Sequence, residues 1–278
     1  MLQIVTNSLK KESKLEKIHF ISGLPRSGTT LLSAILNQNP RFSASISGPA
    51  ARIVRAIVME SQAQTGYKIQ CPESKRKKLI GNMLDTYYED SNPVVFDTNR
   101  GWGLMTPLLA DMYPESKMIC CVRDIPWVID SFEQLFRKNP YSMSSMFNES
   151  DGVDVYARAN SLMRPDRTIG FALNALKQAA FGGERSNILL VRYEDLSKNP
   201  ERILKDVYAF IGEPYFAHDF NHVETSHDEF DADVGLKGMH STRAKVEFIQ
   251  RRTILPPDLW QGLEPLSFWN QMSKGYGK

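Results

Sequence analysis

The segment Gly-Leu-Pro-Arg-Ser-Gly-Thr-Thr at positions 23–30 constrains the fold of this chain more than any other feature. The apolar run at 18–21 that precedes it is typical of a short, buried strand in a parallel sheet. After it, apolar residues recur at helical spacing over 29–37, and Pro40 lies just past the predicted helix end. Strand, glycine turn and helix together predict the opening half of a βαβ unit.

The same alternation of strands and helices continues to about residue 211. Further strands are predicted over 94–96, 118–122 and 188–191, helices over 52–62, 74–88, 104–112, 126–137, 168–181 and 200–211, and a loop over 38–49. This order predicts an α/β fold, an open parallel sheet with helices on both faces. We expect a single domain over 1–278 with its core at about 18–250. Ligands of such sheets bind beyond the carboxyl ends of the strands.

Composition bounds the possible partners and the compartment. The formal charge of +2 gives no strong overall field, so no nucleic-acid partner is expected. No apolar run approaches the roughly 20 residues of a membrane-spanning helix. The three cysteines, Cys71, Cys120 and Cys121, form a poor disulfide framework and lack zinc-site spacing, which favours reduced thiols and a cytoplasmic protein. No pattern in the sequence indicates an oligomeric state.

The turn at 23–30 nearly fits the phosphate-binding pattern GxxxxGK[ST]. Its glycines let backbone N–H groups converge on an anion at a helix N-terminus. Thr29 stands where the pattern has lysine, and Arg26 is the only cation in the turn. A nucleoside triphosphate would need that lysine with Mg²⁺, so the turn suits a less charged group and requires no metal. A plain glycine-rich turn without a ligand is the alternative.

The stretch G-L-P-R-S-G-T-T-L-L resembles the 5′-phosphosulfate-binding loop of the PAPS-dependent sulfotransferases. Its arginine makes it most like the bacterial and Golgi-type branches, which include the protein-tyrosine sulfotransferases. The resemblance implies a P-loop-like sulfotransferase fold and PAPS as the donor, with PAP as the product. It also implies a 5′-phosphosulfate site made of Arg26, Ser27, Gly28, Thr29 and Thr30.

A second anion site is expected after the strand at 118–122. Arg123 follows that strand, and an arginine there can fork two bonds onto a phosphate or simply pair with a carboxylate. The resemblance favours the phosphate, because the family places a serine eight residues after this arginine, as Ser131 is here. It also implies that Tyr193, in the segment Y-E-D-L, lies near the adenine, and that Lys237 and Arg243 contact the 3′-phosphate.

Sulfuryl transfer needs a general base that takes the acceptor proton and a cation that stabilises the transferred charge. Asp97 is the first candidate base, with Arg100 as the stabilising cation, although a structural Asp97–Arg100 pair is an equal alternative. His240 is the second candidate. In the tyrosine sulfotransferases the base is a glutamate just after the first helix, but 43–49 contains no carboxylate here. Two serines of that region, Ser45 and Ser47, are then expected to line the acceptor site.

The predicted activity is therefore in-line transfer of a sulfuryl group from PAPS to a hydroxyl or amine, with general-base assistance. A P-loop nucleotide or small-molecule kinase is the main alternative, and a non-catalytic binding module is the third. Peptide tyrosine, a phenol, a sugar and a lipid all stay open as acceptors, because the loops that would form the acceptor site carry no recognisable motif.

Overall fold

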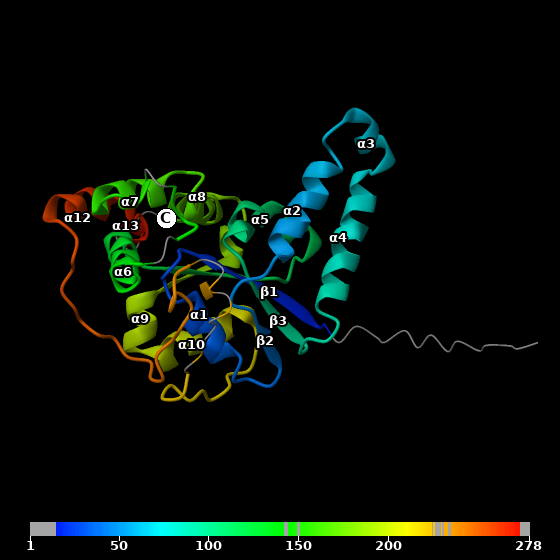
Figure 1. Ribbon diagram of the computed structural model, residues 1–278. Coiled ribbons are helices and arrows are strands. Elements are labelled where there is room, and N and C mark those ends of the chain that lie inside the picture. Colours follow the sequence, from blue (N-terminus) through cyan, green and yellow to red (C-terminus); the bar gives the residue numbers. More distant parts are fainter. Residues whose placement is uncertain are drawn as a thin grey trace, which may run out of the picture.

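A five-stranded parallel sheet forms the centre of the protein (Figure 1). The computed structural model describes residues 15–141, 144–148, 151–223, 225, 229, 231–232 and 235–272. The strands are β1 (Lys17–Gly23), β2 (Phe42–Ala44), β3 (Val94–Thr98), β4 (Met118–Val122) and β5 (Ile188–Arg192). They lie in the order β2-β3-β1-β4-β5. The predicted open parallel sheet is confirmed.

Helices cover both faces of this sheet, and successive residues of a strand point to opposite faces. On β1, Phe20 packs into the core beneath α8 (Thr168–Phe181), α6 (Ile125–Lys138) and α2 (Ala50–Glu60). The next residue, Ile21, packs against α1 (Thr29–Leu36) and α10 (Pro200–Ile211) on the opposite face. Cys120 and Cys121 on β4 divide in the same way. This period of two is what a strand buried on both faces requires.

Several short elements were not predicted. The strand β2 lies inside the segment expected to be loop, and its Phe42 ring packs 5.1 Å from Phe96 on β3. Three short helices, α3 (Thr65–Gln70), α7 (Val155–Met163) and α9 (Tyr193–Lys198), were also missed. The remaining elements are α4 (Glu73–Tyr87), η1 (Arg100–Leu104), α5 (Thr106–Met112), η3 (Arg185–Asn187), α12 (Pro257–Leu263), η4 (Glu264–Leu266) and α13 (Trp269–Met272).

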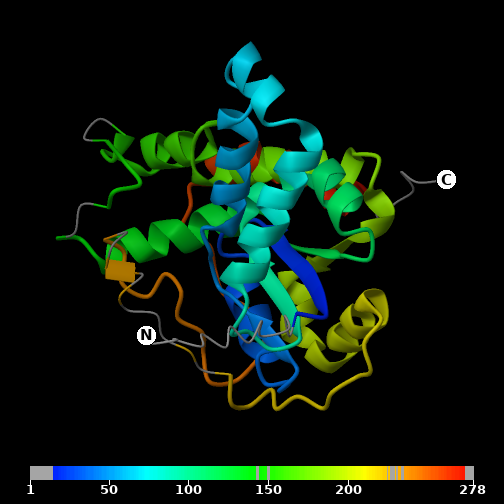
Figure 2. The ribbon, with the colours of Figure 1, turned by 90° about the vertical axis from the view of Figure 1, so that its right-hand side faces the viewer.

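The helices α2, α3 and α4 form a hairpin that projects from the sheet (Figures 1 and 2). Its foot lies at the carboxyl end of β2 and β3, because the N–H of Gly48 donates to the carbonyl of Thr98 at 3.2 Å. Its tip, α3, buries no residue. Within the described residues, no helix has the length and apolar character to cross a membrane.

Candidate active site

Two glycines shape the loop between β1 and α1. Gly23 has a φ of 121°, and a Cβ atom there would lie 2.0 Å from the carbonyl oxygen of Cys121. Gly28, with a φ of 94°, is the N-cap of α1 and offers no side-chain cap. The first N–H groups of α1 have no partner within the helix, and the helix dipole adds positive potential there. The loop can therefore hold a phosphate or sulfate group.

Arg26 supplies the cation of this loop. Its backbone is left-handed, with a φ of 60°, which costs a non-glycine residue roughly 1–3 kcal/mol. Its Nε donates to Ser131 Oγ on α6 at 3.1 Å, and its Nη1 donates to the carbonyl of Met239. Burial and the nearby Arg123 lower the pKa of Arg26 to about 10, so it remains charged at neutral pH. The strained residue thus holds a cation between the glycine loop and α6.

Replacing Arg26 with alanine should lower turnover at least about tenfold. The substitution removes the cation of the loop, and a charge-assisted bond to an oxyanion contributes roughly 1.5–3 kcal/mol. The measurement is steady-state transfer, with circular dichroism to verify that the variant folds. Arg202→Ala is the matched control, because Arg202 is exposed on α10 and lies outside the cleft described below. Unchanged kinetics in the Arg26 variant would exclude a role for this guanidinium.

Arg123 brings the second predicted anion site to the same place. Its Nη1 donates to the carbonyl of Arg26 at 3.3 Å, and its Nε lies 3.8 Å from Glu194. Its guanidinium also lies 4.4 Å from the centre of the Tyr193 ring. Only 14% of the side chain is exposed, and its buried Nε has no hydrogen-bond acceptor in the part of the chain that the structure describes. A buried guanidinium N–H without an acceptor fits a site for a phosphate oxygen.

The hydroxyls of the loop divide between two roles. Ser27 is buried, and its Oγ lies 2.6 Å from the carbonyl of Leu24 and 2.9 Å from that of Cys121. Its side chain therefore shapes the loop and does not line the cleft. Thr29 and Thr30 do line it.

Asp97 occupies a different position from the one expected of a general base. It is the fourth residue of β3 and is fully buried. One carboxylate oxygen accepts from the Tyr88 hydroxyl and the other from Trp102 Nε1. Burial raises the pKa of Asp97. Among the described residues no ion pair joins it to Arg100, and it is absent from the cleft lining, so this geometry counts against Asp97 as the base.

Asp97→Asn should therefore retain most of its turnover. The amide oxygen can accept from Trp102, and the amide N–H can donate to the Tyr88 oxygen. Exchanging charged hydrogen bonds for neutral ones should lower the free energy of unfolding by about 1 kcal/mol. Urea unfolding and transfer kinetics measure the two effects separately. A fall in transfer of roughly 10²–10⁴ without loss of fold would restore Asp97 as the base.

His240 is the candidate base that does line the cleft. Its Nδ1 lies 2.8 Å from Asp231, a carboxylate with 1% of its surface exposed. A carboxylate accepts from N–H, so this contact places the proton on Nδ1 and the basic lone pair on Nε2. Burial lowers the pKa of His240, Asp231 opposes the change, and Arg100 and Arg26 add to it. The imidazole is thus held near both cations in its neutral form.

The late loop that carries His240 is tied down from two directions. The carboxylate of Asp231 also accepts the backbone N–H groups of Gly238 at 2.9 Å and His240 at 3.1 Å. Behind the loop, the N–H of Thr242 donates to the carbonyl of Thr225 and that of Val223 to the carbonyl of Ala244. These bonds hold the imidazole against the glycine loop.

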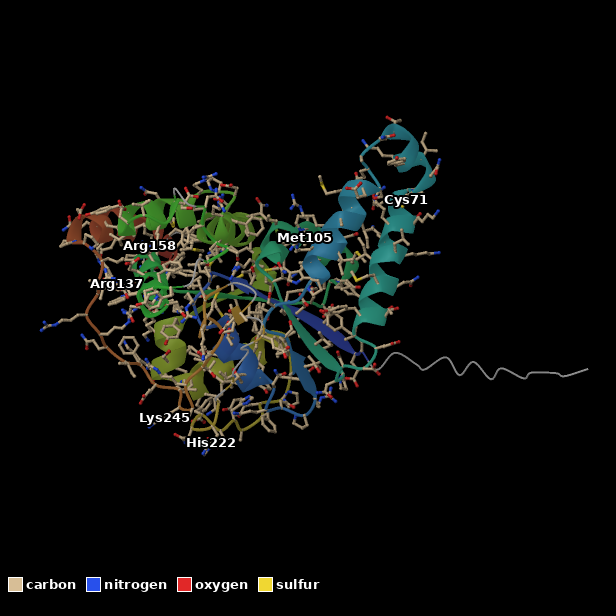
Figure 3. All side chains as sticks on the ribbon, viewed as in Figure 1. Cys71, Met105, Arg137, Arg158, His222 and Lys245 are labelled. Atoms are coloured by element: carbon tan, nitrogen blue, oxygen red, sulfur yellow. The ribbon has the colours of Figure 1, made fainter. Side chains whose placement is uncertain are left out.

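A cleft of about 1300 Å³, which we call the basic cleft, is lined by Arg26, Thr29, Thr30, Arg123 and His240. Among the described residues, eleven arginines and lysines line it against two carboxylates, Asp166 and Glu247. Arg100 lines it from η1, and burial lowers its pKa to about 10. Arg243 is exposed on its rim, with no contact among the described residues that would define its role. Figure 3 shows one lining residue, Met105, where α2 and α5 approach each other, far from Cys71 at the hairpin tip.

Sequence patterns did not single out two residues of this site. Asp231 lies in an acidic stretch for which no site residue was predicted. Arg251 lies beyond the predicted core, and it reaches back to Asp130 on α6 and lines the cleft near Arg123. Neither residue carries a local motif, so only the folded chain reveals them. The described residues contain no group of three or more His, Cys, Asp or Glu that could hold a metal ion.

Comparisons with known proteins agree with this arrangement. Residues 19–217 match the model of the Sulfotransferase family. Protein-tyrosine sulfotransferase 1 from Danio rerio is 24% identical over 273 residues, covering 91% of this chain and 68% of the relative. Mouse sulfotransferase SULT7A1, solved with PAP, aligns with a TM-score of 0.52 and 15% identity over 94% of this chain and 89% of that chain. Sulfotransferase STF9 from Mycobacterium avium gives a TM-score of 0.51 and 14% identity, covering 95% and 78%.

Proposed function

Because this chain belongs to the sulfotransferase family, we propose that PAPS is its sulfuryl donor and that the basic cleft binds it. The contact between Arg26 and Ser131 carries the proposal, since it brings the two predicted anion sites into one place from positions 105 residues apart. Two features suited to binding an anion fit such a donor, the N-terminus of α1 and the buried Nε of Arg123. The family assignment supports sulfuryl transfer and not the kinase alternative.

In this proposal the donor lies across the carboxyl ends of β1, β4 and β5. The loop residues Arg26, Gly28, Thr29 and Thr30, with the backbone N–H groups of α1, hold the 5′-phosphosulfate. Arg123 and Ser131 hold the 3′-phosphate, assisted by Arg251 or Arg243 from the late segment. Tyr193, beside Arg123, contacts the adenine. SULT7A1 was solved with PAP, which supports a ligand of this kind.

The chemistry assigned to the protein is general-base catalysis with charge stabilisation. The acceptor oxygen or nitrogen forms a bond to sulfur, and the bond from sulfur to the bridging oxygen breaks. The electron pair of the broken bond stays on the 5′-phosphate. His240 Nε2 takes the acceptor proton, and Asp231 stabilises the resulting imidazolium. Arg26 and Arg100 stabilise the charge on the transferred group and on the bridging oxygen.

A binding experiment tests the donor assignment. Adenosine 3′,5′-bisphosphate should raise the melting temperature of the protein in the presence of excess EDTA, and ATP with Mg²⁺ should not, because the loop lacks the lysine that binds a triphosphate. Transfer from PAPS should also survive EDTA. If ATP–Mg²⁺ raised the melting temperature and adenosine 3′,5′-bisphosphate did not, the result would contradict the proposal and favour the kinase alternative.

For the acceptor we propose only a range of hydroxyl compounds, and for the compartment only the cytoplasm. The name of the Danio rerio relative identifies protein tyrosine as its acceptor, while a phenol, a sugar or a lipid hydroxyl would meet the same catalytic groups. We propose a cytoplasmic location on the basis of the thiols, since Cys71, Cys120 and Cys121 are all unpaired and the last two are fully buried.

A further inference from the structure

The basic cleft has a second end, on the side of the sheet away from the donor residues. Arg123 and Tyr193 follow β4 and β5, whereas η1 and α2 follow β3 and β2. The glycine loop after β1 lies between the two groups. The loop before α2 is anchored on this second side, where the N–H of Ser45 donates to the carbonyl of Phe96 and its Oγ accepts from the N–H of Thr98. Ser47 lines the cleft from the same loop.

One face of α2 turns two arginines into this second end. Its cleft-lining residues are Ala51, Arg52, Arg55, Val58 and Met59, which follow the helical period. Arg52 and Arg55 are exposed, one turn apart, and no carboxylate or other side chain among the described residues pairs with either. By contrast, two arginines nearer the donor residues face carboxylates, Arg123 facing Glu194 and Arg251 facing Asp130. Two adjacent, uncompensated guanidinium groups form a ready site for one anionic group.

The walls around these arginines are apolar. Met59 is 58% exposed and Leu104 is 42% exposed, and both line the cleft. Met105 and Leu108 continue this wall from η1 to α5, and Phe171 adds a ring from α8. Large apolar side chains left open inside a cleft indicate that an apolar surface covers them when the ligand is bound.

We propose that this end accepts a small amphiphilic acid, an apolar body that carries both the hydroxyl to be sulfated and a carboxylate or phosphate. The apolar body lies along Leu104, Met105 and Met59, and the anionic group pairs with Arg52 and Arg55. The hydroxyl then reaches His240 beside the glycine loop. This inference rests on the proposed function and identifies the class of acceptor for the same site. The arginines lie inside the cleft beside this wall, which favours a small molecule over an extended peptide.

A matched pair of phenols tests the inference. The probes are 3-(4-hydroxyphenyl)propionate and its amide, which share one hydroxyl and one body and differ in charge. Calorimetry on the protein loaded with PAP should show tighter binding of the acid by about ten- to hundredfold, and the same ratio should appear in kcat/KM. In the double variant Arg52→Gln, Arg55→Gln the ratio should fall toward one, whereas Arg202→Gln should keep it.

Two further measurements separate this inference from the proposed function. PAP affinity should be unchanged in the double variant, because Arg52 and Arg55 lie at the other end of the cleft from the donor residues. A wild type that binds no PAP and does not turn over the amide would reject the donor assignment itself. Equal affinity of the wild type for acid and amide would overturn the proposal of an amphiphilic acid. An acid-to-amide affinity ratio that is unchanged in the double variant would overturn it as well. A peptide acceptor would replace the amphiphilic acid under one further result. In that result, a peptide with a tyrosine flanked by acidic residues binds the wild type more tightly than the phenol acid does, and the difference in affinity disappears in the double variant.

Discussion

Replacing His240 with alanine should slow sulfuryl transfer by about 10²–10⁴-fold and leave PAP affinity nearly unchanged. The imidazole lines the cleft, and its Nδ1 is held by the buried carboxylate of Asp231 at 2.8 Å. Alanine removes the proton acceptor but none of the groups that hold the nucleotide. Single-turnover transfer measures the chemical step, and calorimetry with PAP measures donor affinity.

The pH profile of the wild type gives an independent readout of the same residue. Burial, Arg100 and Arg26 together hold the pKa of His240 below its usual 6.5, although Asp231 acts in the opposite direction. A general base must be neutral, so kcat/KM for PAPS, which reports the free enzyme, should fall only as the pH drops below 6.5, and this acid limb should vanish in the alanine variant.

A second histidine provides a matched control. His222 also pairs with a carboxylate, its Nδ1 lying 2.6 Å from Asp219, but its side chain is 83% exposed. His222 is not among the residues that line the cleft. His222→Ala should therefore leave transfer unchanged. An active His240 variant together with an inactive Asp97→Asn variant would show that our choice of base is wrong.

Arg123 should make the protein prefer a nucleotide with a 3′-phosphate by a factor of tens to thousands in affinity. The wild type should bind adenosine 3′,5′-bisphosphate more tightly than AMP by this factor, because AMP lacks the 3′-phosphate and leaves a buried guanidinium without its partner, at a cost of roughly 2–5 kcal/mol. The Arg123→Ala variant lacks the guanidinium that binds the 3′-phosphate, so it cannot distinguish the two nucleotides by that group. Its preference should shrink toward one, mainly through weaker binding of the bisphosphate.

Calorimetry with both nucleotides on wild type, Arg123→Ala and Arg202→Ala measures this selection directly. Near-ultraviolet circular dichroism checks that the loss of the stacking contact with Tyr193 does not disturb the fold. Equal affinity of the wild type for the two nucleotides would remove the 3′-phosphate site and, with it, the main support for PAPS as donor.

The proposed donor half of the site could be predicted because its sequence signals are local. The glycine loop, the strand before it and the helix after it are contiguous, and the backbone geometry of Gly23 and Gly28 follows from those neighbours. Arg123 was singled out by its place after a strand, and the resemblance to the sulfotransferases favoured a phosphate as its ligand. The structure puts it at the carboxyl end of β4. Alternation of strands and helices likewise predicted the parallel sheet.

The residues proposed for catalysis were harder to predict from the sequence, for two physical reasons. Aspartate is disfavoured in strands, so the predicted strand ended at Phe96 and left Asp97 outside, whereas β3 extends to Thr98. Inside the strand the pleat directs Asp97 into the core, toward Trp102. The pairing of His240 with Asp231 depends on a loop that tertiary contacts hold in place, and no local periodicity encodes it.

The uneven distribution of charge affects how quickly the enzyme captures its donor. The whole chain carries a formal charge of +2, yet among the described residues eleven arginines and lysines and two carboxylates line the cleft, which gives the cleft a net charge of +9 and leaves the remainder net negative. An anionic nucleotide is therefore drawn toward the mouth of the cleft and repelled from other surfaces, which makes its collisions productive more often than chance. Dissolved salt weakens this long-range attraction but barely affects the short contacts that retain the bound nucleotide. Ionic strength should thus govern the association rate of the donor far more than its residence time.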